Sequence, residues 1–292
     1  MMMQSRRQIW LYPMFQVPLM LMLGCLILAA LFSLLGWGRP AVGVAIAIDL
    51  SSSTEGAVRQ EEIAAVKSYL AENRNLENQN QIRVFGFANN VQALTTGFNA
   101  NSDEVEKEFD RTVQDAQLQR YLGGGTNLDL AIQEGTNALS SLDNKLCREL
   151  LLVTDGEATV SQTVIDGAIS QNVKINAVVL GGQDAVQIRQ ATASTNGIYL
   201  NGEAGNLKAL FTEEFFTNFN SNKRWLTFWL SCAFICAMWA VTLPLDRWLF
   251  QGLLKLNMTL GGQLALGNAL FWTVVTALVV WRIFGLPFGS AC

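Results

Sequence analysis

The sequence contains no histidine. This absence excludes the hydrolases that use histidine as the catalytic base, the HExxH zinc proteases and every transition-metal site built on imidazole. Any metal chemistry in this chain must therefore rely on oxygen ligands or on cysteine.

Charge is also scarce. Only 15% of the 292 residues are charged, and half of the residues are hydrophobic, whereas charged residues make up about a quarter of an ordinary soluble protein. The net charge is −4 and no run of lysine or arginine occurs, so the chain lacks the basic surface that a nucleic-acid partner requires. The composition therefore predicts a membrane component and no nucleic acid.

Three runs contain no charged residue at all, at residues 13–38, 225–245 and 256–281. Each is long enough to cross a hydrocarbon layer of ~30 Å at ~1.5 Å per residue. The first run is longer than the apolar region of a signal peptide, and no clear A-x-A cleavage pattern follows it. We therefore predict that it is a retained anchor.

These runs predict how the chain is organised. The predicted segments are a cytoplasmic N-terminal segment (1–12), a first transmembrane helix (13–38), a soluble domain (39–222), a second transmembrane helix (225–245), a short interfacial loop (246–255), a third transmembrane helix (256–281) and a C-terminal tail (282–292).

Basic residues indicate an orientation in the membrane. Arg6 and Arg7 precede the first helix, and Arg247 and Lys255 lie between the second and third, so the positive-inside rule favours a cytoplasmic N-terminus and an extracytoplasmic soluble domain. Basic residues that flank the domain oppose this orientation: Arg39, Lys223 and Arg224.

The soluble domain alternates short apolar runs with longer amphipathic stretches. The runs are too apolar for a sheet with one solvated face, which predicts an α/β fold: a doubly wound, mostly parallel sheet with helices on both faces, in addition to the three transmembrane helices. Predicted strands are 42–48, 81–87, 91–96, 146–153, 174–180 and 197–200, and predicted helices are 55–72, 103–116, 127–142, 159–171, 185–195 and 207–220.

Three loops of this sheet carry oxygen-bearing side chains. Asp49, Ser51 and Ser53 follow the first strand in a D-x-S-x-S pattern, Thr126 follows three glycines, and Asp155 follows a central strand. Ligands of doubly wound sheets gather at the carboxyl ends of the strands, and carboxylates and hydroxyls are the ligands of Mg²⁺, Ca²⁺ and Mn²⁺. Taken singly, each loop could be only a helix cap or a turn; their joint occurrence predicts a metal site.

In this combination the domain resembles the von Willebrand factor A family, also called the integrin I-domain fold. The resemblance covers roughly residues 41–220 and implies a metal-ion-dependent adhesion site made of Asp49, Ser51, Ser53, Thr126 and Asp155. In this family the serines and the threonine approach the metal, the aspartates often act through water, and one position stays open for an acidic group of a partner. Ser52 departs from the family, in which many members have glycine.

The arrangement of a single helix before the domain and a hairpin after it is similar to the Bat-type aerotolerance proteins of bacteria. This resemblance implies an integral protein of a bacterial inner or plasma membrane, with a MoxR-type AAA+ ATPase system as a possible partner. The expected cofactor is a divalent cation, Mg²⁺ first and Ca²⁺ or Mn²⁺ as alternatives. One expected partner is a protein that supplies an acidic residue to the metal. The other is the lipid bilayer. The sequence is also compatible with an oligomer.

The sequence therefore predicts a membrane-anchored, non-enzymatic protein that binds a partner through a divalent cation and serves to assemble or regulate a membrane complex. An alternative is a subunit of a channel or transporter whose metal site regulates the membrane helices. A metal-dependent phosphoryl-transfer enzyme is less favoured, because the sequence lacks histidine, a Walker A lysine and a second acidic cluster.

Overall fold

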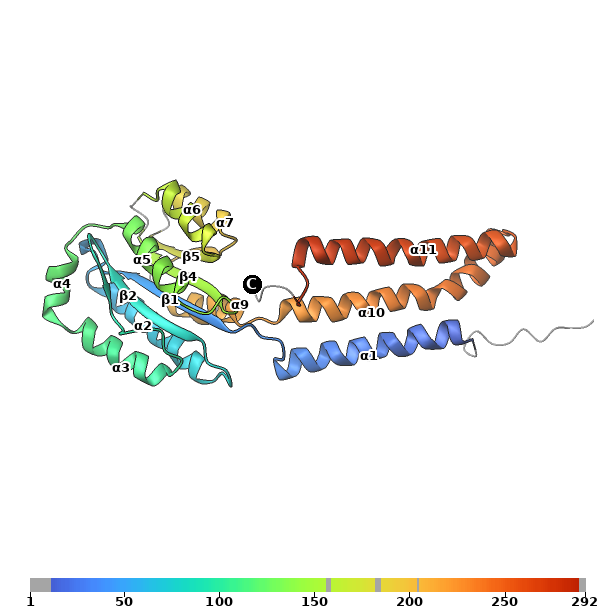
Figure 1. The fold of residues 1–292 in the computed structure, drawn as a ribbon, viewed down its shortest axis with the longest axis horizontal. Helices are drawn as coiled ribbons and strands as arrows, with labels where there is room; N and C mark the ends of the chain where they lie inside the picture. Colours follow the sequence, from blue (N-terminus) through green and yellow to red (C-terminus); the bar gives the residue numbers. More distant parts are fainter. Residues whose placement is uncertain (1–11, 156–158, 182–184, 204, 289–292) are drawn as a thin grey trace, which may run out of the picture. The chain divides into compact units, whose positions relative to one another are not determined.

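The computed structural model describes residues 12–155, 159–181, 185–203 and 205–288. They fall into two compact units (Figure 1). One unit is the segment 40–221, and the other combines the residues before and after it.

The first unit is built on a six-stranded sheet with the order β3-β2-β1-β4-β5-β6. All neighbours are parallel except β3, which is antiparallel to β2. The strands are β1 (Val42–Asp49), β2 (Gln81–Phe87), β3 (Val91–Ala93), β4 (Cys147–Thr154), β5 (Val173–Leu180) and β6 (Tyr199–Gly202). This sheet confirms the predicted α/β class.

Helices cover both faces of the sheet (Figure 1). Alternate side chains of a strand point to opposite faces, and in β1 Ile46 and Ile48 join one core while Ala45 and Ala47 join the other. The first core packs against α2 (Ala57–Arg74), α3 (Ser102–Val113), α4 (Ala116–Leu122) and the last helix of the domain, and the second packs against α5 (Leu128–Ser140), α6 (Gln162–Ser170) and α7 (Val186–Ser194).

Two predicted elements differ in the structure. The helix predicted at 103–116 is α3, which ends at Val113, and a further helix that was not predicted, α4, begins at Ala116. The side chain of Asp115 caps α4, because it accepts a hydrogen bond from the Gln117 amide at 2.9 Å. The last helix of the domain runs without a break, but its hydrogen-bonding pattern changes along its length. It comprises α8 (Leu207–Ala209), a π-helical stretch η3 (Leu210–Phe216) and α9 (Thr217–Phe219).

The second unit contains three helices of membrane-spanning length and hydropathy. They are α1 (Pro13–Leu35), α10 (Lys223–Pro244) continued by the π-helical η4 (Leu245–Leu253), and α11 (Met258–Val279) continued by η5 (Val280–Phe284). Most of the segment predicted as an interfacial loop, 246–255, is thus helical. The helix continues because the residues after Pro244 keep an apolar face, and the chain turns only near Lys255, whose φ is 52°.

Candidate metal centre

The predicted site lies at the carboxyl edge of the sheet, where β1 and β4 end side by side. The register pairs Ile48 of β1 with Val153 of β4, so the next residues, Asp49 and Thr154, are neighbours at that edge. Because every residue of both strands is buried, the end of β1 is held firmly, and the backbone of Asp49 has a fixed position.

Asp49 is held by two hydrogen bonds, one to each oxygen of its carboxylate. The Ser51 amide donates to Oδ1 at 3.0 Å, and the Thr154 hydroxyl donates to Oδ2 at 2.9 Å. Asp49 is 0% exposed, and its burial, reinforced by the negative charge of Asp155, raises its pKa, while the hydrogen bonds from Ser51 and Thr154 act in the opposite direction. The carboxylate is therefore held in a fixed orientation, while its burial still disfavours the charged form.

The segment after Asp49 is a short 3₁₀ turn, η2 (Ser52–Thr54), which brings alternate serines together. The Oγ atoms of Ser51 and Ser53 are 3.0 Å apart, as the D-x-S-x-S spacing predicts. Thr54 fixes the turn, because its hydroxyl donates to the Asp49 carbonyl at 2.7 Å. Ser51 is buried and Ser53 is exposed, so the pair points from the core towards the surface.

Two residues that the sequence did not single out hold the backbone of this turn. Arg59 of α2 donates from Nη2 to the carbonyls of Leu50 and Ser51, at 3.0 and 3.1 Å. Gln119 of α4 donates from Nε2 to the carbonyls of Leu50 and Gly123, at 3.2 and 3.3 Å. No local pattern marks either residue, because both act from helices that reach the turn only through the tertiary fold.

The glycine-rich loop lies against the same turn. The Ser52 amide donates to the Gly124 carbonyl at 3.1 Å. A Cβ atom on Gly124 would lie 2.7 Å from Ser52 Oγ, and one on Gly125 would lie 2.1 Å from Asn89 Oδ1, so the side chains of Ser52 and Asn89 would have to rotate away from a larger residue in this loop. Thr126, two residues beyond Gly124, is half-buried.

Asp155 follows β4 directly and is half-buried. Its charge contributes to the raised pKa values of Asp49 and of Glu62, which places its carboxylate near both. Gly156, the next residue of the predicted loop, lies outside the described residues.

The donor set suits a hard divalent cation, since it consists of carboxylates and hydroxyls. Within the described part of the chain, no group of three or more His, Cys, Asp or Glu side chains is placed to hold a metal ion. A metal at this edge would therefore depend on the serine and threonine hydroxyls as much as on Asp49 and Asp155.

A third carboxylate, that of Glu62 in α2, is coupled electrostatically to Asp49 and Asp155 and was not foreseen from the sequence. It is 0% exposed, and neither carboxylate oxygen has a hydrogen-bond partner within the described residues. Burial, together with the charges of Asp49 and Asp155, raises its pKa well above its ordinary value, and only the charge of Arg59 opposes this. Burial therefore makes the Glu62 carboxyl harder to ionise than an ordinary glutamate.

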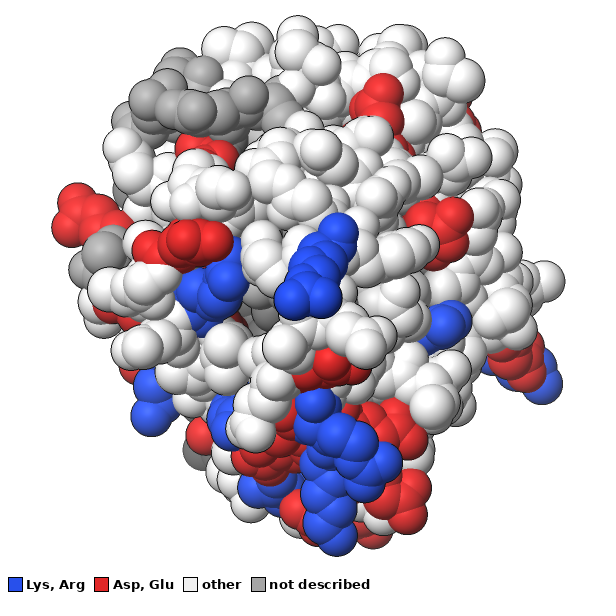
Figure 2. All heavy atoms as spheres, turned by 90° about the vertical axis from the view of Figure 1, so that its left-hand side faces the viewer, with Lys and Arg blue, Asp and Glu red and all other residues white. Residues whose placement is uncertain are grey.

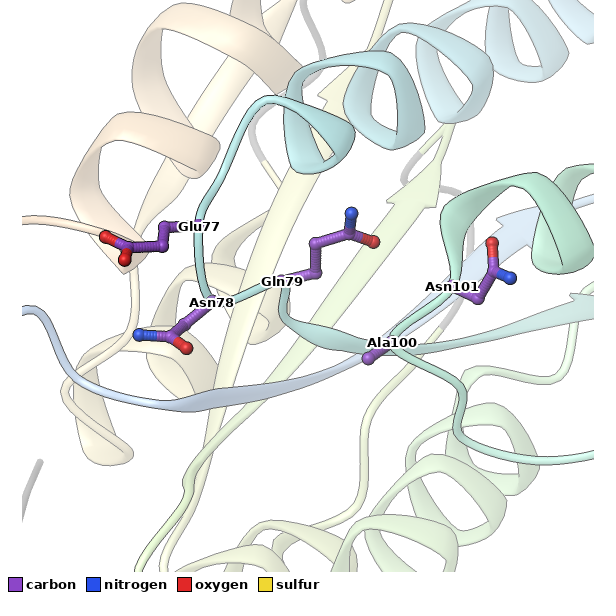
Figure 3. A pocket seen from close by; sticks show the side chains of 5 residues that line it. All are labelled: Glu77, Asn78, Gln79, Ala100 and Asn101. Carbon is purple, nitrogen blue, oxygen red and sulfur yellow. The ribbon is translucent and has the colours of Figure 1, made fainter.

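An open pocket of about 600 Å³ lies elsewhere on the domain (Figure 3). Its lining comes from the loop before β2 and the loop before α3. Two of the lining side chains accept hydrogen bonds from backbone amides. Asn101 accepts from the Asp103 amide at 3.1 Å, and Gln79 accepts from the Ser102 amide at 3.5 Å. Both side chains therefore stabilise the start of α3.

Comparisons with known proteins identify the family of the soluble domain. Residues 44–157 match the family model of the von Willebrand factor type A domain. The chain therefore combines a match to this domain family over residues 44–157 with three helices able to span a membrane. A search of curated proteins finds no match to the chain.

Several solved structures are similar to the chain at low identity. BatB from Bacteroides thetaiotaomicron is 15% identical, with a TM-score of 0.47, over 59% of this chain and 97% of that one. An aerotolerance-related membrane protein from Bacteroides fragilis is 14% identical, with a TM-score of 0.47, over 59% of this chain and 96% of that one. Proximal thread matrix protein 1 from the mussel byssus, solved with a zinc-occupied MIDAS motif, is 16% identical, with a TM-score of 0.47, over 60% of this chain and 47% of that one.

Proposed function

We propose that this membrane protein binds a partner protein through a divalent cation held by Asp49, Ser51, Ser53, Thr126 and Asp155. The partner would supply an aspartate or glutamate to the cation, and the binding would assemble or regulate a membrane-associated complex. The observation that supports this most strongly is the arrangement around Asp49. Its carboxylate is fixed from two directions, beside a pair of serine hydroxyls 3.0 Å apart.

The residues around the site favour binding to a carboxylate. A bound divalent cation would supply a Lewis-acidic centre for one further carboxylate. Asp49 and Asp155 are the acidic residues of the proposed set, and the family resemblance implies that they act through water. The neutral hydroxyls would then contact the cation directly, so the cation would keep part of its charge for the partner. Ser53 and Thr126 are accessible enough to border the open side.

The face of the molecule at the carboxyl edge supports the same assignment. On the part of it that the structure describes, Figure 2 shows no broad patch of one sign; lysine, arginine and acidic side chains mix, mostly at the lower edge. A partner's acidic residue would thus be selected by the cation rather than by a basic surface.

Our proposal extends to the cation and the setting. Mg²⁺ is the first choice and Ca²⁺ or Mn²⁺ the alternatives, since all three prefer oxygen ligands. The domain would face the extracytoplasmic side of a bacterial inner or plasma membrane, and a MoxR-type AAA+ ATPase system is a candidate partner on the basis of the Bat-type resemblance. Protease access to the domain in intact spheroplasts tests the orientation.

A non-enzymatic role fits these residues best. The domain has no histidine to serve as a base, and Asp49 is already engaged by two donors. A screen with generic phosphate-ester substrates tests the phosphoryl-transfer alternative, and metal-dependent turnover would overturn the non-enzymatic assignment.

The central experiment uses the full chain in lipid nanodiscs. Binding of Mn²⁺ is followed by electron paramagnetic resonance, and capture of partner proteins from solubilised membranes is compared with and without EDTA. Asp49→Ala should abolish both, while Ser52→Ala, which changes an exposed residue of the same turn that is not in the proposed set, should preserve both. Capture that is unchanged by EDTA and by Asp49→Ala would reject the proposal.

A second candidate function is a channel or transporter subunit whose metal site regulates the membrane helices. The supporting observation is the short connection, because α9 ends at Phe219 and α10 begins at Lys223. Within the membrane unit, Asn222 donates to the carbonyls of Phe32 and Trp37, at 2.5 and 3.1 Å, so the start of α10 is fixed to the end of α1.

This candidate is tested with a flexible Gly/Ser spacer inserted after Ser221, which leaves the Asn222 contacts intact. Accessibility of α10 and α11 to hydrogen exchange is measured with and without Mg²⁺. Regulation predicts a Mg²⁺-dependent difference that the spacer removes. No difference in the unmodified chain, or one that survives the spacer, would reject it.

A further inference from the structure

The buried face of α2 includes an acidic side chain. The buried residues of this helix recur every three or four positions, as one face of an α-helix does; they are Glu62, Ala65, Val66, Tyr69, Leu70 and Asn73. The four residues between Glu62 and Asn73 belong to the core on one face of the sheet. At the far end, the amide of Asn80, directly before β2, donates to Asn73 Oδ1 at 2.9 Å. That end of α2 therefore lies at the amino edge of the sheet, and Glu62 lies towards the opposite edge.

Glu62 belongs to the part of α2 that adjoins the turn η2 of the candidate metal centre. The helix begins at Ala57, and Glu62 lies about 7.5 Å along its axis at ~1.5 Å per residue. Arg59, three positions before Glu62, is a neighbour on the same side of the helix. Its Nη2 donates to the carbonyls of Leu50 and Ser51 at 3.0 and 3.1 Å. The helical turn that carries Glu62 is thus bonded directly to the turn after β1.

The Glu62 carboxylate lacks the compensation that a buried charge needs. It is 0% exposed, and within the described residues neither of its oxygens has a hydrogen-bond partner. The charges of Asp49 and Asp155 repel it, and the charge of Arg59 attracts it. A buried charge in this condition lowers stability, and an uncharged side chain of similar size would stabilise the fold more. Residues that act against the stability of a fold are typical of functional sites.

We propose that Glu62 is a third acidic residue of the cation site, which strengthens cation binding through its charge and does not touch the ion. This inference rests on the proposed function. Within the described part of the chain, no three acidic side chains are grouped so that they could hold one ion together, so Glu62 is not a ligand beside Asp49 and Asp155. A divalent cation between these carboxylates would replace their mutual repulsion with attraction, and burial limits the screening of that attraction by water and salt.

This role predicts opposite effects on stability and on affinity. An uncharged residue in place of Glu62 removes the unfavourable buried charge, so the domain without metal becomes more stable. The same replacement removes the attraction to the cation, so binding becomes weaker. A residue that only filled space in the core would behave differently, because its replacement would lower both quantities together.

The test compares Glu62→Gln and Glu62→Leu with the wild type as full chains. Mn²⁺ affinity is measured by electron paramagnetic resonance in nanodiscs, and thermal unfolding by circular dichroism in detergent with EDTA at pH 8. Both variants should bind Mn²⁺ about tenfold to about a hundredfold more weakly, the range found when groups that support a metal's ligands are replaced. Both should unfold at a higher temperature than the wild type.

Glu55→Gln is the matched control. It removes the same charge from a residue directly after η2, but Glu55 is exposed, so solvent and salt screen it, and Mn²⁺ affinity should be unchanged. Wild-type affinity in both Glu62 variants would overturn the proposal, and so would an unfolding temperature that falls in both. A wild-type chain that does not bind Mn²⁺ would instead reject the proposed function itself, and this inference with it.

Discussion

The hydroxyl of Thr154, the last residue of β4, donates to Oδ2 of Asp49, the last residue of β1, across 2.9 Å. Both residues are completely buried. This contact links the two central strands at the edge where the proposed cation would bind. The orientation of Asp49 therefore depends on a residue 105 positions away in the sequence.

Replacing Thr154 with valine keeps the shape of the side chain but removes the donor to Asp49. We expect the unfolding free energy to fall by about 1–3 kcal/mol, because a buried carboxylate oxygen loses a partner, and Mn²⁺ affinity to fall by about tenfold or more. Calorimetry and Mn²⁺ titration measure the two effects. Thr136→Val is the control, since the buried Thr136 hydroxyl has no hydrogen-bond partner within the described residues; an equal loss of affinity in that variant would contradict the role given to Thr154.

The side chain of Gln119 contacts the turn after Asp49 through the backbone carbonyl of Leu50. In Gln119→Leu the carbonyls of Leu50 and Gly123 lose this donor, so we expect weaker Mn²⁺ binding by about tenfold and faster amide exchange in residues 50–54. Gln117→Leu changes an exposed glutamine of the same helix and should bind Mn²⁺ normally. Unchanged exchange and affinity in Gln119→Leu would show that the turn is held without it.

The pH dependence of stability tests Glu62. Its pKa is raised well above the ordinary value of 4.5, so the folded protein keeps a proton that the unfolded chain has released. From about pH 4.5 up to the raised pKa, the folded state binds more protons, and stability falls as the pH rises. Glu62→Gln should flatten this part of the profile and stabilise the domain at pH 8.

The measurement is thermal unfolding followed by circular dichroism in detergent with EDTA. Glu149, whose pKa is also raised by burial, remains in both proteins and contributes the same background. A profile for Glu62→Gln parallel to the wild type would show that Glu62 is ionised in the folded state.

Gly197 tests the packing of the last strand. A Cβ at this position would lie 1.9 Å from the Ile175 carbonyl oxygen, which belongs to the backbone of β5 and cannot rotate away. Gly197→Ala should therefore lower the unfolding free energy by about 3 kcal/mol. Gly167→Ala in α6 meets nothing within 4 Å and should raise it by about 0.5–1 kcal/mol; the opposite order would contradict the described packing.

Part of the site could be predicted from sequence because it is local. The D-x-S-x-S spacing predicts that Ser51 and Ser53 converge, and their Oγ atoms lie 3.0 Å apart. The involvement of Thr126 and Asp155 in metal binding remains a prediction. Glu62 illustrates the limit, because it follows Glu61 in an amphipathic helix and resembles a solvated residue until α2 is packed against the sheet.

The sequence by itself determined the three apolar spans, the alternation of strands and helices, and the loops that carry the oxygen ligands. These features follow from hydropathy and from periodicities of two and 3.6 residues, which act over short distances along the chain. Only the tertiary structure decided that Thr154 orients Asp49, that Arg59 and Gln119 hold the backbone of the turn after Asp49, and that Glu62 is buried. Each of these depends on which elements pack together, and therefore on contacts between residues far apart in the sequence.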